Sequence, residues 1–352
     1  MSERLNRRTI TTLGIVVSLG FLSASLLSSQ SLAVESSKSQ LSAKRAEPAD
    51  PAKVLTVEAC VKCHPSEVSV WKATPHSQTF EQLHRLPEAK KIAANMGIRS
   101  IKYDNRCVAC HYTQQMEQGS PVAVSGISCE SCHGAARDWV DIHHNYGGEG
   151  VTREAESAAH KAMRVSNSIE AGMKNPNNVF LVAQSCYRCH TVQDEELVNQ
   201  GGHNAGSLDF EFVSWSQGMV RHNFVRSDGR VNDPSPQPRM RVMFVAGMIA
   251  DLEASWRATA SATEKAGFGI NAAKRSARAA ARLKSVAGKI ENPYLSKVLQ
   301  VYSKIKLQLN NERQLNAAAD IIAILGFEFA ENTDGASLET LDAFIPQSDR
   351  WK

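Results

Sequence analysis

Apolar residues recur at helical spacing throughout the C-terminal third of the chain. The first stripe consists of Val242, Val245, Ile249, Leu252 and Trp256, and side chains three or four positions apart share one face of a helix. Three more stripes follow, within 271–289 (Ala277, Ala280, Leu283, Val286), within 294–309 (Tyr294, Leu295, Val298, Leu299, Tyr302, Ile305, Leu309) and within 312–329 (Leu315, Ala319, Ile322, Leu325). The pattern predicts a helical hairpin or bundle over 240–352. Its stripes form a core or, as the alternative, an interface through which the chain forms a homo-oligomer.

A segment in which proline alternates precedes these helices. Residues 233–239 contain Asp233-Pro-Ser-Pro-Gln-Pro238, which predicts a stiff linker, since proline interrupts both helices and strands. The part before it, 56–232, shows no comparable long stripes, so short helices and loops are expected there. The whole chain is therefore predicted to be mainly α.

The N-terminus has the three parts of a secretory signal. Basic Arg4, Arg7 and Arg8 precede an apolar run from Leu13 to Leu27, and Ser31-Leu32-Ala33 provides small residues for cleavage. We expect a signal peptide over 1–33 and a flexible leader over 34–55, and hence a periplasmic protein. An uncleaved membrane anchor is the alternative, although the run is short and rich in serine and glycine for a span.

Four copies of Cys-x-x-Cys-His carry the chemistry of the chain. They are Cys60-Val-Lys-Cys63-His64, Cys107-Val-Ala-Cys110-His111, Cys129-Glu-Ser-Cys132-His133 and Cys186-Tyr-Arg-Cys189-His190, and they use all eight cysteines. In a c-type haem site the two thiols form thioether bonds to the porphyrin and the histidine is an axial ligand of the iron. Redox dithiols, zinc sites and disulfides leave unexplained why histidine follows every second cysteine. The motifs therefore predict four covalently bound haem c groups within 56–232.

Composition excludes other classes of function. The chain has 40 basic and 36 acidic residues, and without residues 1–33 it has 37 against 35. This balance gives no reason to expect a nucleic-acid partner. No nucleotide or flavin fingerprint is present either.

Seven histidines remain as candidates for the second axial ligand. They are His76, His84, His143, His144, His160, His203 and His222, and all eleven histidines lie before the Pro-rich segment. Methionine is the other usual ligand and would raise the potential, but the methionines of this region show no comparable pattern.

The motifs and their surroundings resemble the tetrahaem cytochrome c-554 family. The resemblance covers residues 57–225 and rests on Trp71-Lys72-Ala-Thr74-Pro-His76, on Gly126-Ile-Ser-Cys129-Glu-Ser-Cys132-His133-Gly134 and on the order of the four motifs. These cytochromes are related to octahaem hydroxylamine oxidoreductases and pentahaem nitrite reductases. The helices after residue 238 lie outside the part that matches.

The resemblance implies which histidines are distal ligands. It makes His76, His143 and His222 ligands, with His144 as the alternative to His143. It pairs His64 with His222, His133 with His76 and His190 with His143. In the family the second haem, here on His111, is open to small ligands. In this chain His203 follows Gly201-Gly202 and could close that face, line it as a proton donor, or do neither.

Two functions are compatible with these features. The first is electron transfer between redox protein partners through closely packed, mostly bis-histidine haems, and we prefer it because no further catalytic constellation is recognisable. The alternative is a reductase of a small nitrogen oxide such as nitric oxide at an open haem on His111. No Cys-x-x-Cys-Lys site is present, which argues against a pentahaem nitrite reductase.

Overall fold

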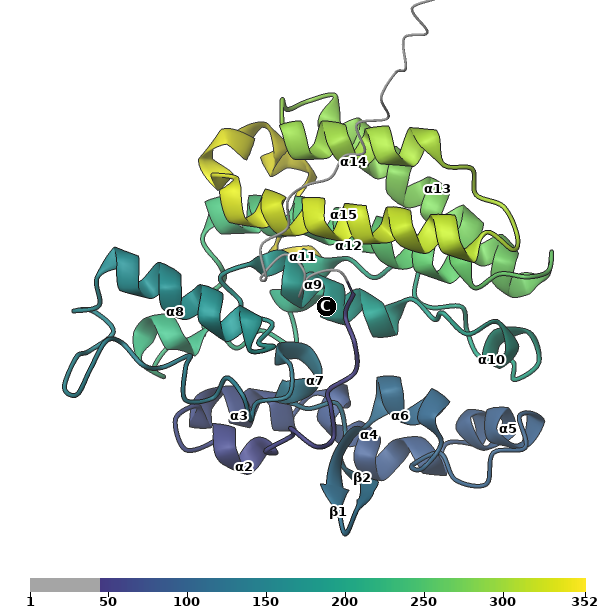
Figure 1. The fold of residues 1–352 in the computed structure, drawn as a ribbon, viewed down its shortest axis with the longest axis horizontal. Coiled ribbons are helices and arrows are strands. Elements are labelled where there is room, and N and C mark those ends of the chain that lie inside the picture. The colour runs from purple at the N-terminus through teal and green to yellow at the C-terminus, as the bar shows by residue number, and fades with distance from the viewer. Residues whose placement is uncertain (1–44) are drawn as a thin grey trace, which may run out of the picture. The chain divides into compact units, whose positions relative to one another are not determined.

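The computed structural model describes residues 45–352, so the predicted signal peptide and the first half of the predicted leader (34–44) lie outside the described residues. Residues 45–352 belong to one compact unit. The mainly α fold that the sequence predicts is confirmed (Figure 1). In this part of the chain, no helix combines the length and the apolar character that crossing a membrane requires.

Short helices dominate the part that contains the haem motifs. They are α2 (Val57–Cys60), α3 (Pro65–Lys72), α4 (Pro75–Gln82), α5 (Pro87–Asn95), α6 (Asn105–His111), α7 (Cys129–His133), α8 (Ala158–Glu170), α9 (Val179–His190), α10 (Glu195–Asn199) and α11 (Phe212–Ser216). Loops and 3-10 turns at Leu83–Arg85 and Phe224–Ser227 connect them. A small apolar cluster, which includes Ile101, Val108 and Tyr112, joins α5 to α6.

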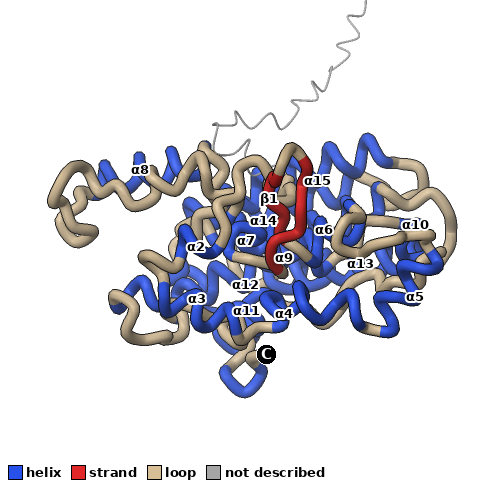
Figure 2. The backbone as a smooth tube through the Cα atoms, turned by 90° about the horizontal axis from the view of Figure 1, so that it is seen from below, coloured by secondary structure: helices blue, strands red, loops and turns tan. Residues whose placement is uncertain are grey.

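A β-hairpin between the second and third motifs was not expected from the sequence. Strands β1 (Thr113–Glu117) and β2 (Ser120–Ser125) pair antiparallel (Figure 2). Gln118 and Gly119 connect them with φ of 49° and 81°, the two left-handed residues that a tight hairpin turn requires. Glutamine is uncommon at such a position, so only Gly119 indicates the turn at the level of sequence.

Four long helices form the C-terminal part, as the apolar stripes predict. They are α12 (Gln237–Ala260), α13 (Gly267–Ala287), α14 (Pro293–Lys304) and α15 (Glu312–Asn332), and a 3-10 segment, Gly335–Phe344, follows. Asn292 caps α14 by accepting hydrogen bonds from the amides of Tyr294 and Leu295. Central α12 is almost fully buried and packs against α13, α15 and α9.

The predicted linker ends inside a helix. Residues 237–239 form the first turn of α12, where Pro238 is tolerated because the amides of a first turn have no intrahelical partner. Pro236 occupies the N-cap position, and the amide of Ser235 donates to the side chain of Gln217 at 2.7 Å. Of the predicted linker, only residues 233–235 precede the N-cap of α12 and form a non-helical connection.

The main apolar core continues across this connection. Phe180 and Leu181 of α9 are fully buried in the same cluster as the stripes of α12 to α15. A Cβ atom at Gly326 of α15 would lie 2.3 Å from the Phe180 ring, so glycine lets the two helices approach. The division into a haem-binding domain (56–232), a linker (233–239) and a helical domain (240–352) remains a proposal, and the two larger parts share one core.

We expect Gly326→Ala to destabilise the protein by roughly 1–3 kcal/mol, because the added methyl group overpacks the contact with Phe180. Thermal unfolding followed by circular dichroism measures the change. Gly288→Ala is the control, since position 288 is exposed, has ordinary helical φ and leaves at least 3.6 Å around a Cβ atom. Equal melting temperatures for Gly326→Ala and the wild type would contradict the close packing of α9 on α15.

Candidate haem-binding sites

Each motif lies on a helical turn or directly after one. Helices α6, α7 and α9 end on His111, His133 and His190, while the first motif begins at the last residue of α2 and continues as a turn. Residues three and four positions apart share one face of a helix. The two thiols and the imidazole of a motif therefore lie on the same side, as attachment of one macrocycle requires. All eight thiols are free.

A second imidazole faces each motif histidine across a gap of constant width. The ring centroids are 6.4 Å apart for His64 and His143, 6.3 Å for His190 and His76, 6.2 Å for His111 and His203, and 6.1 Å for His133 and His222. An imidazole–metal bond is about 2 Å long, so two such bonds and the half-widths of two rings span about 6 Å. The four gaps fit an iron bound from both sides.

The structure corrects the pairing but uses the same histidines. The resemblance pairs His64 with His222, His133 with His76 and His190 with His143, and all three pairs are wrong. The chain instead brings His143 to His64, His222 to His133 and His76 to His190. Each partner belongs to a segment whose position depends on tertiary packing, which spacing along the chain does not reveal.

Among the described residues, His84, His144 and His160 form no ring pair with a motif histidine. His144 stacks edge-on against His143 instead, with centroids 5.1 Å apart. His160 is hydrogen-bonded through Nδ1 to Glu156 at 2.7 Å. Of the two neighbours that the sequence left open, His143 is therefore the one that faces a motif.

Three distal imidazoles are oriented by their own backbone. Nδ1 contacts a carbonyl oxygen at 2.5 Å in His143 (Val140), at 2.7 Å in His203 (Asn204) and at 2.6 Å in His222 (Val220). Donation from Nδ1 fixes the tautomer in which Nε2 is free to bind a metal. The rings are thus set for ligation through Nε2.

Burial favours the neutral form of these imidazoles. Desolvation, with a smaller contribution from the neighbouring imidazoles, lowers the pKa of His111, His133 and His190 to about 4. Burial also lowers the pKa of His76 and of His143. The neutral form, which is the one that binds iron, therefore predominates at neutral pH.

The Trp-Lys-x-Thr-x-His segment positions His76 through specific contacts. The Trp71 indole donates to the carbonyl of Ile127 at 2.7 Å, and the Ile127 amide donates back to the carbonyl of His76 at 3.0 Å. Thr74 caps α4, the helix that contains His76, by accepting a hydrogen bond from the Ser77 amide. A Cβ atom at Gly126 would lie 2.3 Å from the His76 carbonyl, so glycine permits this approach. The segment ties the distal ligand to the strand that leads into the third motif.

Glu130, within the third motif, has a role that the sequence did not suggest. Its buried carboxylate accepts hydrogen bonds from the amides of Leu55 and Thr56 at 2.9 Å and of Ala136 at 2.8 Å. Burial raises the pKa of Glu130, and these three amides oppose that shift. The carboxylate fastens the chain before the first motif to the third motif.

The thiols show which sites adjoin. Cys60 lies within hydrogen-bonding reach of Cys129, and Cys110 within reach of Cys189. Cys132 lies within electrostatic range of Cys189. The first site therefore adjoins the third, the third adjoins the fourth, and the fourth adjoins the second.

The second and fourth sites open into one cavity of about 450 Å³. Both imidazole pairs line it, together with thiols of three motifs and a mainly apolar wall from α5, α9 and α11. Near its edge, Leu86 has 46% of its surface exposed. Space that side chains leave empty around two facing imidazole pairs is what macrocycles would fill.

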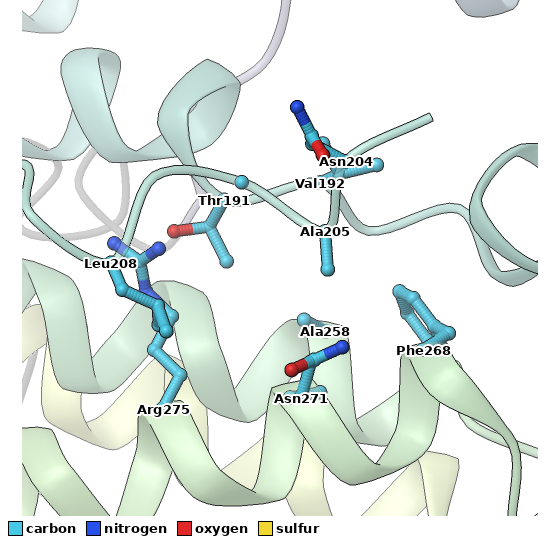
Figure 3. A pocket seen from close by; sticks show the side chains of 11 residues that line it. Thr191, Val192, Asn204, Ala205, Leu208, Ala258, Phe268, Asn271 and Arg275 are labelled. Atoms are coloured by element: carbon cyan, nitrogen blue, oxygen red, sulfur yellow. The ribbon is translucent and has the colours of Figure 1, made fainter. Parts of the chain in front are cut away.

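A buried arginine of the C-terminal part holds the loop that contains His203 (Figure 3). Arg275 extends from α13 towards this loop and donates to the carbonyls of His190 at 3.2 Å and Ser207 at 2.8 Å. Its Nε donates to Asp251 of α12 at 2.7 Å. A second cavity, of about 190 Å³, lies between the loop and the helices. The sequence placed Arg275 only among the basic residues of a helix, and nothing in the pattern indicated that it is buried.

Comparison with known proteins agrees with the motifs. Residues 59–134 match the family model described as cytochrome c554 and c-prime. Cytochrome c-554 of Nitrosomonas europaea is 32% identical over 96 residues, which cover 25% of this chain and 41% of that protein. The chain thus spans less than half the length of this relative. No solved structure matches. Residues 59–134 are therefore similar to the cytochrome c-554 family, and this similarity supports covalent binding of haem c at the cysteine–histidine motifs.

Proposed function

We propose that this protein is an exported, periplasmic tetrahaem cytochrome that transfers electrons between redox protein partners. The observation that carries the proposal is the set of four imidazole pairs at 6.1–6.4 Å. Bound haem c supplies reversible one-electron chemistry at its iron. Two fixed imidazoles on each iron keep the ligand set the same in both oxidation states, which suits transfer and leaves no position for a substrate.

The thiol contacts support one linear route. It runs from the His64 site to the His133 site, then to the His190 site and finally to the His111 site, because motif thiols of neighbouring sites lie within hydrogen-bonding or electrostatic range of each other. The two ends are also close to solvent. Cys63 is exposed beside His64, and the cavity around His111 reaches the surface at Leu86. We therefore place one partner at each end.

The geometry disfavours the reductase alternative. A nitrogen oxide would need a vacant face at the His111 haem, and His203 stands opposite His111 at the same separation as the other three pairs. The Arg275 contacts support the loop in that position. In the proposed cytochrome, His203 is accordingly the second axial ligand at the His111 site, and no small molecule is a substrate there.

The oxidised protein should show four low-spin irons by electron paramagnetic resonance, because every site has two imidazoles. A reductive titration should consume four electrons per chain, one for each motif. Carbon monoxide should leave the spectrum of the reduced protein unchanged. Mass spectrometry showing fewer than four haems would contradict the haem count, and one high-spin iron would favour the reductase.

His203→Ala should convert one iron of the four to high spin and allow that iron to bind carbon monoxide. The substitution removes the imidazole that faces His111 and leaves the other three pairs intact. Electron paramagnetic resonance and carbon monoxide difference spectra measure the change. The matched control is His160→Ala, which should leave every iron low-spin because His160 pairs with Glu156. An unchanged spin state in His203→Ala would exclude His203 as a ligand.

Arg275→Lys should partly convert the same iron to high spin. Lysine keeps a positive charge near Asp251 but lacks the planar fork that reaches both loop carbonyls. The fraction of high-spin iron at equilibrium measures how firmly the loop holds His203. Arg278→Lys, on the exposed face of the same helix, is the control. If both variants keep four low-spin irons, the loop does not depend on Arg275.

A further inference from the structure

The near balance of charge over the whole chain conceals one strongly basic segment. Residues 267–304, which contain α13 and α14, have eight lysines and arginines but a single acidic residue, Glu291. Subtracting these from the totals of 40 and 36 leaves 32 basic against 35 acidic residues elsewhere. The positive charge of the protein is therefore concentrated in one helical pair.

Most of this charge points to solvent. Arg275 is buried against Asp251, and Arg282 is partly buried. The six other basic residues are exposed or half-exposed, and we call their surface the basic face: Lys274, Arg278, Lys284, Lys289, Lys297 and Lys304. The opposite sides of both helices are buried in the core, with Leu283 and Val298 fully inaccessible. Each helix is thus apolar inward and basic outward.

The basic face lacks carboxylate partners within the described part of the chain. The ion pairs formed by the C-terminal helices there join Arg241 to Asp342, Arg257 to Glu253 and Asp320, and Arg275 to Asp251. Three lysines instead lie near aromatic rings: Lys284 at 5.4 Å from Tyr302, Lys289 at 4.8 Å from Phe344 and Lys297 at 5.9 Å from Tyr294. The charge of the face is left for an external partner.

The position of the basic face separates it from the electron route. In Figure 1, α13 and α14 lie at the top, and α12, α15 and α9 lie between them and the helices of the first three haem motifs. Helix α13 meets the His203 loop through its buried side, at Arg275, whereas the basic face is the exposed side of the helical pair. Binding through the exposed side leaves the helices of the first three motifs uncovered, since they lie beyond α12, α15 and α9.

We propose that the basic face binds the surface of an anionic phospholipid bilayer. Clusters of roughly four to eight lysines and arginines on an amphipathic helix are typical of proteins that bind acidic lipids. The exposed apolar residues Ile270 and Leu309 lie near the start of the segment and beyond its end, and the Phe344 ring, 46% exposed, lies beside Lys289. A specific protein interface would need a cluster of apolar anchors at its centre. Several exposed charges with one aromatic ring beside them fit a lipid surface, where electrostatic attraction and a small buried apolar area act together.

Co-sedimentation of the mature, haem-loaded protein with vesicles tests this proposal. Vesicles of phosphatidylcholine and phosphatidylglycerol should retain the protein at low salt, vesicles of phosphatidylcholine alone should not, and high salt should release it. Lys274→Glu, Arg278→Glu and Lys284→Glu together should weaken retention by about tenfold or more. These side chains are exposed, and an unchanged haem absorption spectrum and circular dichroism spectrum check that the variant is folded.

The control reverses three exposed charges elsewhere. Lys90→Glu, Lys91→Glu and Arg99→Glu change the net charge by the same amount on and beside α5, and this variant should keep most of the retention. An equal loss in both variants would show that net charge alone is responsible and would overturn the proposal. Failure of the wild-type protein to bind phosphatidylglycerol vesicles, or equal binding to phosphatidylcholine, would overturn it as well.

Discussion

Each of the four sites depends on one fixed distance, the gap of about 6 Å between two facing imidazoles. The paired histidines stand between 79 and 114 positions apart in the sequence, yet their separations agree within 0.3 Å. Local rules place only one partner, because a helical turn sets the motif histidine beside its two cysteines. The other partner must be brought by the tertiary fold. The contacts of Trp71 and Arg275 hold segments that carry such a second partner, whereas those of Glu130 hold the first motif against the third.

The two parts of the molecule obtain their stability differently. The C-terminal helices bury a large continuous core, to which α9 contributes Phe180 and Leu181. The haem-binding part has only a small apolar cluster of its own, around Ile101 and Tyr112, and much of its interior is cavity lined by thiols and imidazoles. Helix α9 belongs to both, since it packs in the core along its length and ends at His190. The helical bundle therefore provides the rigid base on which the fourth site is built.

The sequence predicted the parts of the structure that local patterns determine. The helical stripes identified all four C-terminal helices, and the motif spacing predicts that two thiols and one imidazole lie on the same side of each turn. The pairing of distal histidines could not be predicted, because it depends on which segments the fold brings to the first motif, to α7 and to α9. The hairpin at Gln118-Gly119 was missed because glutamine is an unusual residue for a left-handed turn. Arg275 and Glu130 were missed for a related reason, since burial of a charged side chain leaves no periodic signal.

Because each site combines two histidines that are far apart in the sequence, the order in which the sites can mature differs from the order of the motifs. A chain that emerges from its N-terminus presents His64, His111 and His133 well before His143, His203 and His222, so those three sites wait for a segment that appears later. The fourth site is the exception, because His76 has already emerged when His190 appears. Its α9 helix, however, packs against α12 and α15, which appear later still. The set of four iron sites is thus complete only when the C-terminal helices are in place. The last part of the chain to appear therefore decides when the whole electron route is formed.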